Sequence, residues 1–207
     1  MALVKLNNNG VKNATAFGSI TGLGSMTFIK KLTASSSSTL TFHHGTDGVV
    51  LDSTYKEYLF TFKDIRGNHE DGRFQFQTNA VGASGFNETI TSTYFKAQHN
   101  QSGSYSVLAY VTGYDQAQGT AFQNMSDASG KSSTAERTHA GTITLYNPSS
   151  TTFVKHFISN FSDALSDDYM TESFVSGYIN TTSAIDEVRF QMSTSTFNGD
   201  ICLYGIA

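Results

Sequence analysis

The feature that most constrains this chain is a two-residue alternation of apolar and polar side chains. It is strict in residues 73–78 (RFQFQT), and in residues 55–65 it places Tyr58, Phe60 and Phe62 on one face. Successive side chains of a strand point to opposite faces, so the pattern predicts strands with one face in a core and one in water. A polar segment, 66–72, separates these two strands. We therefore expect residues 55–78 to form a hairpin with a long loop.

Other segments have the same strand-like composition and are separated by turn-forming residues. The expected strands are 26–32, 39–43, 89–97, 104–112, 141–146, 153–159, 174–180, 185–192 and 201–206. The expected turns and loops are 35–38, 100–103, 124–133, 147–150 (which holds Pro148) and 198–200. Residues 162–170 are the one place where a short helix is expected.

About ten strands with frequent turns predict an all-β fold, an antiparallel β-sandwich that is jelly-roll-like. The 207 residues include 16 Phe and 10 Tyr, enough apolar volume for one core. We expect a single domain over residues 25–207. Residues 1–24 are rich in Asn and Gly, show no period, and predict an N-terminal arm. Two interpretations of the arm stay open: an irregular lead-in, or an extended segment that docks on a neighbouring subunit.

Charge and cysteine content exclude several classes of protein. The net charge is −4 and only 14% of residues are charged, which argues against electrostatic binding of nucleic acid. No apolar run is long enough to span a membrane, so we expect a soluble protein made in a cytoplasm. Cys202 is the single cysteine, which excludes an internal disulfide. We expect its side chain to pack as a small hydrophobe.

The motifs of common catalytic sites are missing from the sequence. There is no Gly-x-Ser-x-Gly elbow and no phosphate-binding loop. His43 and His44 are adjacent on an expected strand, so they should face opposite sides and cannot hold one ion together. We therefore predict no catalytic residue, no cofactor and no enzymatic activity. A hydrolase of surface polysaccharide, which would need two carboxylates across a cleft, is the minor alternative.

Two groups of residues could still bind a ligand. Asp163, Asp167, Asp168 and Glu172 could hold calcium in a loop, but they lack the EF-hand spacing, and we favour a solvated acidic loop. His69, Glu70 and Asp71 are interpreted as the tip of the 55–78 hairpin.

Aromatic residues are the other candidate ligand group, because exposed rings stack on sugars. Tyr94, Tyr110, Tyr114 and Tyr169 could bind a glycan in this way. Most of them lie in expected strands, so packing in a core or in a subunit interface is the favoured interpretation.

Five segments carry a resemblance to a known group of proteins. The chain resembles structural (virion) proteins of marine tailed bacteriophages, of the kind that infect cyanobacteria and SAR11 bacteria. The resemblance covers nearly the whole chain and is carried by residues 1–17 (MALVKLNNNGVKNATAF), 55–65 (YKEYLFTFKDI), 147–157 (NPSSTTFVKHF), 178–186 (YINTTSAID) and 203–206 (LYGI).

The resemblance implies a particle component without catalytic residues. We expect a subunit on the exterior of the virion, either a head decoration or knob or a tail-attached module, made in the host cytoplasm. Its expected partners are capsid or tail proteins and further copies of itself, with a homotrimer as one option. A glycan- or receptor-binding adhesion module that contacts the host surface is the alternative function.

Overall fold

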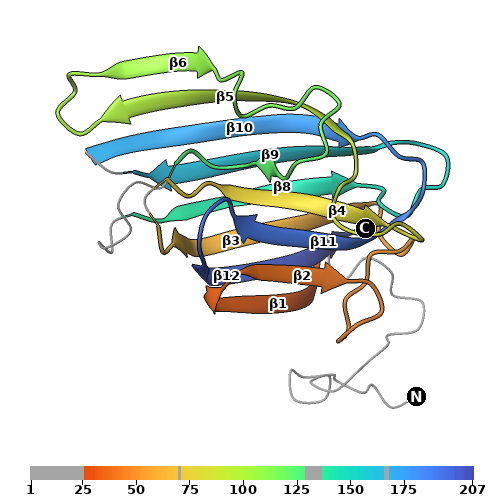
Figure 1. Ribbon diagram of the computed structural model, residues 1–207. Coiled ribbons are helices and arrows are strands. Elements are labelled where there is room, and N and C mark those ends of the chain that lie inside the picture. The colour runs from red at the N-terminus through yellow and green to blue at the C-terminus, as the bar shows by residue number, and fades with distance from the viewer. Residues whose placement is uncertain (1–25, 70, 129–136, 166–167) are drawn as a thin grey trace, which may run out of the picture.

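The computed structural model describes residues 26–69, 71–128, 137–165 and 168–207, and these form two antiparallel β-sheets (Figure 1). The larger sheet has eight strands in the order β1-β12-β3-β8-β9-β10-β5-β6, and the smaller has four in the order β2-β11-β4-β7. The strands are β1 (Met26–Ser37), β2 (Thr39–His43), β3 (Glu57–Gly67), β4 (Phe74–Ala80), β5 (Ile90–Asn100), β6 (Ser106–Tyr110), β7 (Gln123–Asn124), β8 (His139–Tyr146), β9 (Lys155–Ala164), β10 (Tyr169–Ile179), β11 (Ile185–Met192) and β12 (Phe197–Ile206).

The predicted all-β antiparallel sandwich is confirmed, with twelve strands where about ten were expected. The jelly-roll pattern of connections stays a prediction. The N-terminal arm predicted over residues 1–24 lies outside the described residues.

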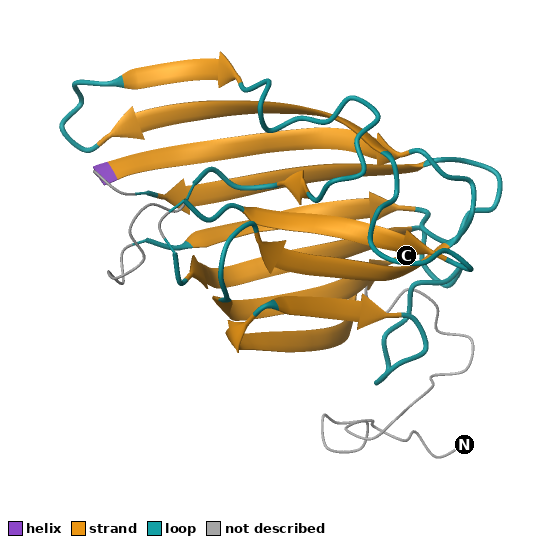
Figure 2. Ribbon diagram, viewed as in Figure 1, coloured by secondary structure: helices purple, strands orange, loops and turns teal. Residues whose placement is uncertain are grey.

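The short helix predicted over residues 162–170 is wrong, because β9 continues to Ala164 and β10 begins at Tyr169. Figure 2 shows strands and loops almost throughout the described chain. None of the described residues belongs to a helix that is long and apolar enough to cross a membrane.

The predicted hairpin over residues 55–78 is also wrong. β3 pairs with β12 and β8 in the larger sheet, whereas β4 pairs with β11 and β7 in the smaller one. The connection that contains His69 and Asp71 therefore crosses from one sheet to the other and is not a hairpin tip; Glu70 lies outside the described residues. Alternation fixes which side chains are buried but is the same for a strand in either sheet.

The turn predicted at residues 198–200 lies inside β12, opposite a bulge in β3. The register between β12 and β3 shifts between Asn198 and Asp200. Gly199 has a φ of 132° and Asp64 of β3 has a φ of 54°. Asp64 and Ile65 of β3 stand against Gly199 alone, and this one extra residue bends the pair locally without ending either strand.

Aromatic rings from both sheets form the core. Phe190 of β11 lies edge-on to Phe60 and Phe62 of β3, with ring centroids 5.2 and 5.0 Å apart, and stacks with Phe74 of β4 at 6.0 Å. Tyr58, Phe60 and Phe62 are buried on one face of β3, as the alternation predicted. Contact between rings of opposite sheets ties the two layers into one folding unit.

The larger sheet extends beyond the smaller one, and a loop covers part of the excess. Residues 111–122 first follow the edge of β5 beyond the end of β6, where Ile90 and Gly119 exchange two backbone hydrogen bonds of 2.7 and 3.0 Å, and then pass over the inner face towards β7 (Figure 1). Gln123 is fully buried there and accepts a hydrogen bond from Ser92 at 2.6 Å. This loop shields the inner face of the sheet at β5, and no sheet formed by the described residues packs on the opposite face.

Candidate interaction surface

The face of the eight-stranded sheet that points away from the smaller sheet is called the outer face here. Its members follow from strand register: Tyr110 of β6 is opposite Phe95 of β5, which is opposite Phe174 of β10. Their neighbours along each strand, such as Tyr94 and Val175, are buried on the inner face. The outer face is therefore a broad pleated surface that no described residue covers.

Large apolar side chains gather at the β6 end of this face, where solvent reaches them. Leu108 is 74% exposed, Ile158 55% and Tyr110 53%, and the rings of Phe95 and Phe174 stack at 4.8 Å. We call this group the outer patch: Phe95, Leu108, Tyr110, Ile158, Met170 and Phe174. A contiguous exposed apolar patch of this kind marks a site of contact with another molecule.

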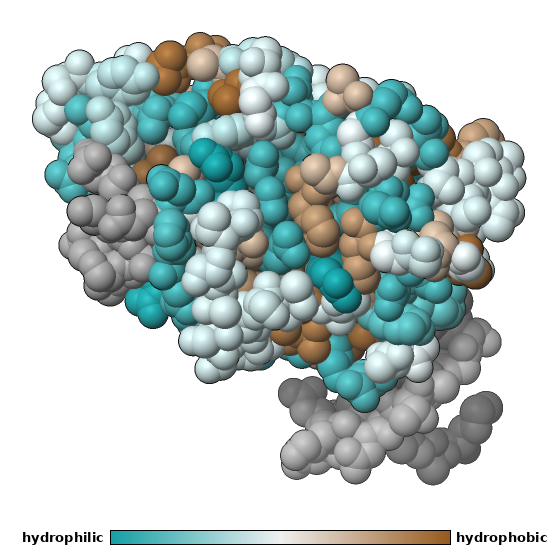
Figure 3. Space-filling model, in the orientation of Figure 1, coloured by the Kyte–Doolittle hydropathy of each residue, from teal (hydrophilic) through white to brown (hydrophobic). Residues whose placement is uncertain are grey.

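Figure 3 shows the side of the molecule on which the smaller sheet lies. Brown, apolar areas there are separated by hydrophilic residues.

Three shallow hollows lie on the outer face. One of about 440 Å³ is lined by Phe95, Ile158 and Phe174, and one of about 490 Å³ by Ala97, Leu108 and Met170, among others. A third of about 470 Å³ is lined mainly by Thr91, Thr93, Tyr146, His156, Ile158 and Tyr178. Among the described residues that line them, Glu172 is the one carboxylate, and it accepts a hydrogen bond from Asn160 at 3.1 Å. The hollows are suited to apolar groups and hydroxyls.

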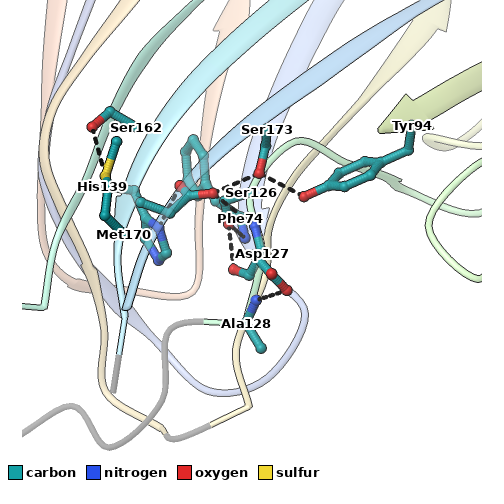
Figure 4. Close-up of polar contacts among 10 residues, drawn as sticks. Phe74, Tyr94, Ser126, Asp127, Ala128, His139, Ser162, Met170 and Ser173 are labelled. Atoms are coloured by element: carbon teal, nitrogen blue, oxygen red, sulfur yellow. Dashed lines mark hydrogen bonds and ion pairs between the residues drawn. The ribbon is translucent and has the colours of Figure 1, made fainter. Parts of the chain in front are cut away.

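A buried polar cluster on the inner side of β9 and β10 is the second candidate (Figure 4). The Asp163 carboxylate accepts hydrogen bonds from the hydroxyl of Ser173 at 2.7 Å and from the backbone N–H of Asp127 at 2.9 Å. Nδ1 of His139 lies 2.8 Å from its other oxygen. Tyr94 in turn donates its hydroxyl hydrogen to Ser173 at 2.7 Å. The carboxylate thus joins three strands and the segment that follows β7.

This cluster has the Ser, His and Asp of a hydrolase triad, but its hydrogen bonds connect them differently. Ser173 donates to Asp163 and not to His139, so the imidazole does not contact the hydroxyl that would have to act as nucleophile. Asp163, His139 and Ser173 are all fully buried. Burial also raises the pKa of Tyr94, which keeps its hydroxyl protonated. We interpret the cluster as a structural set of core hydrogen bonds, in which Nε2 of His139 is buried without a hydrogen-bond partner among the described residues.

Lys155 is a second buried polar group, at the start of β9. Its Nζ donates to the backbone oxygens of Phe153 and Thr181, both at 3.1 Å. Burial lowers its pKa from 10.5, and the nearby carboxylate of Glu88 opposes that change. The ammonium group holds two loops together at this end of the sheet.

The acidic residues considered for calcium do not converge. Asp163 of β9 is opposite Thr171 of β10, and both side chains point to the core. Glu172, the next residue of β10, therefore points to the outer face. Asp168 lies in the connection between β9 and β10, and Asp167 is outside the described residues. In the described part of the chain no three His, Cys, Asp or Glu residues are placed to hold a metal ion. The solvated acidic loop is also wrong for Asp163, which is fully buried.

The four candidate tyrosines separate into two groups. Tyr94 is fully buried and lies edge-on to Tyr114 at 5.1 Å, and Tyr114 also contacts the guanidinium of Arg73. Tyr169 is half-buried at the β9–β10 turn, next to Tyr105. Only Tyr110 of the four is largely exposed, and its hydroxyl donates to Asp115. The structure therefore does not bring these four rings into one sugar-binding site.

The remaining candidates have separate, local partners. His43 pairs with Glu187 at 3.1 Å, whereas Nδ1 of His44 accepts the backbone N–H of Leu51 at 3.1 Å. Cys202 is half-buried on the outer face, opposite Thr61 of β3, and is not in the core. Its two neighbours in β12 take the core positions, since a strand alternates its faces.

The outer patch is not among the sites that the sequence predicted. Residues 106–110 (SVLAY) and 94–95 (YF) have apolar side chains on both faces of a strand. That signal indicates a strand covered on both sides, either by its own chain or by a partner. Without the sheet order, the uncovered side could not be identified.

Comparison with known proteins does not assign the chain to a group. Neither a protein-family model nor a curated protein matches its sequence.

Proposed function

We propose that this chain is a non-enzymatic structural protein on the exterior of a tailed phage particle, as a head decoration or knob or as a tail-attached module. Its outer patch would be the contact with neighbouring particle proteins. The sequence resemblance is the source of the particle assignment. The outer patch is the observation that supports assembly as the task.

The outer patch exposes a large apolar area to solvent. Leu108, Ile158 and Tyr110 are each more than half exposed, although Tyr94 and Val175 on the inner face of the same sheet are buried. Burying such groups stabilises a contact by about 25 cal/mol for each Å² removed from water. The near absence of charge among the hollows' lining residues fits a protein partner better than nucleic acid.

Particle composition is the direct test. We expect mass spectrometry of purified virions to detect the chain, and a side-chain-resolution map to show Leu108 and Ile158 in contact with another subunit. Absence of the chain from purified virions would refute the proposal.

A variant pair tests the patch itself. Particles from phage that encodes Leu108→Ser with Ile158→Ser should carry much less of the protein, because the apolar contact is lost. Val81→Ser is a matched control: it removes a side chain that is 58% exposed in the turn after β4, outside the outer patch. Equal incorporation of all three proteins would show that the patch is not the contact.

The third hollow favours glycan binding as a second candidate. Tyr146, His156 and Tyr178 line it together with Thr and Ser residues, and the ring centroids of His156 and Tyr178 are 6.0 Å apart. Aromatic faces next to hydroxyl groups suit a sugar. A glycan array followed by titration tests this, with His156→Ala expected to weaken any binding that is found. No binding at millimolar sugar would count against it.

A further inference from the structure

The two sheets have four edge strands among the described residues, and three of them are blocked. β1 has Lys30 and Lys31 and two register irregularities against β12. β2 follows β1 after a single residue, Ser38, and the two edges lie side by side (Figure 1). β7 is only two residues long. Charges, bulges, coverage and shortness are the usual means by which proteins prevent edge-to-edge pairing.

β6 has none of these protections. Its sequence, SVLAY, has no charge, no proline and no glycine, and its register with β5 is regular. Every position of the strand is at least partly exposed to solvent. An edge of this kind is a template for another strand.

The free hydrogen-bonding groups of β6 can be assigned. Val111 donates its backbone N–H to Tyr94 at 3.0 Å, and Asn100 donates to the backbone oxygen of Tyr105 at 3.2 Å. Backbone groups alternate along an antiparallel strand, so those of Ser106, Leu108 and Tyr110 point away from β5. Leu108 and Tyr110 also belong to the outer patch, so the edge is continuous with the proposed contact surface.

We propose that a second copy of this chain pairs with the β6 edge, antiparallel and centred on Leu108, so that two eight-stranded sheets become one. This inference rests on the proposed function, because the expectation that the chain binds copies of itself comes from there. Leu108 lies opposite Leu108 of the second copy, and Ser106 lies opposite its Tyr110. The arrangement is a closed two-fold contact in which each free backbone group finds a partner.

Self-pairing fits the chemistry of this edge. Like charges opposite one another would destabilise an antiparallel pair, and β6 has none to oppose. A two-fold pair leaves no unpaired β6 edge, whereas an open chain of contacts would lead to fibres. With five residues per strand the interface is small, below about 1,200 Å² in total, so the dimer should depend on concentration.

Disulfide trapping of the purified protein tests the register. In a Cys202→Ser background, Leu108→Cys should form a covalent dimer under mild oxidation, because directly opposed, hydrogen-bonded residues lie about 5.5 Å apart at Cα, within disulfide range. Ser106→Cys alone should not cross-link, but it should do so when mixed with Tyr110→Cys. Equal cross-linking of Leu108→Cys and Ser106→Cys alone, or no cross-linking of either, would overturn the proposal.

A backbone substitution tests the pairing without side-chain chemistry. The N–H of Leu108 points away from β5, so Leu108→Pro should keep the fold, checked by circular dichroism, but remain monomeric in light scattering at every concentration. Leu108→Ala keeps the N–H and should still dimerise. A monomeric parent protein, or a dimeric Leu108→Pro variant, would refute edge pairing. Because both experiments use isolated protein, they are independent of whether the chain is found in virions.

Discussion

At the scale of single residues, the position of Asp163 is the most consequential. Its carboxylate receives Ser173 and the backbone of Asp127 and contacts His139, all in the core. Buried charges persist where hydrogen bonds compensate for their lost hydration. An acidic residue next to a turn suggested a surface loop or a calcium ligand, whereas it is an interior connection between strands.

Replacing Asp163 should therefore destabilise the whole domain. Asp163→Asn turns one acceptor into a donor that faces other donors, and we expect a loss of about 3 kcal/mol in the free energy of unfolding. Glu172→Gln is the matched control. Glu172 follows Thr171, the residue of β10 opposite Asp163, but its side chain lies on the outer face, so the change should alter stability by less than about 0.5 kcal/mol. Urea unfolding measures both. Equal stabilities would contradict the role given to Asp163.

Lys155 should make stability depend on alkaline pH. Burial lowers its pKa in the folded state below 10.5, so between these two values the unfolded chain binds more protons than the folded one. Stability then rises with pH across that interval. We expect the free energy of unfolding of the parent, relative to Lys155→Met, to increase as pH is raised from neutral towards 10.5. Comparing the two proteins cancels contributions from tyrosines. A flat or falling difference would contradict the lowered pKa.

At the scale of elements, the paired irregularity in β12 and β3 shows how a turn-like sequence is accommodated within a strand. Asn198-Gly199-Asp200 has the composition of a turn, and the backbone of Gly199 does leave the extended region. Pairing on both sides of the bulge nevertheless continues, with Phe197 opposite Gly67 and Ile201 opposite Phe62. Local composition indicated the bend, and only the neighbouring strand determined that it lies opposite a bulge.

Gly199 should be intolerant of a side chain. A Cβ there would lie 2.7 Å from Cδ1 of Ile65 and 2.8 Å from the backbone oxygen of Asp64, and φ is positive. We expect Gly199→Ala to lower the free energy of unfolding by about 2 kcal/mol or more, which is seen as a lower midpoint temperature of thermal unfolding. Gly113→Ala is the control, because a Cβ at that position has open space around it. Similar midpoints for the two variants would show that the bulge adapts.

At the scale of the whole molecule, the two sheets share one core and should unfold together. Phe190 contacts rings of Phe42, Phe60, Phe62 and Phe74, which come from both layers. We expect Phe190→Ala to cost about 3–5 kcal/mol and to leave a single transition in which far-ultraviolet circular dichroism and tyrosine fluorescence coincide.

Phe153→Ala controls for the loss of a phenyl ring as such, because Phe153 is 68% exposed. It should change stability by less than about 0.5 kcal/mol. Separate transitions for the two probes in the Phe190 variant would mean that the sheets are independent units.

The sequence by itself determined the class of fold, most of the strand positions and the buried face of β3, because alternation is a local property of the chain. Only the tertiary structure decided that β3 and β4 belong to different sheets, that Asp163 is interior, and that Leu108 and Ile158 face solvent. The physical reason is that pairing between strands joins residues far apart in sequence. A strand with apolar residues on both faces, such as β6, does not record which face its own chain covers and which face and edge it leaves for another molecule.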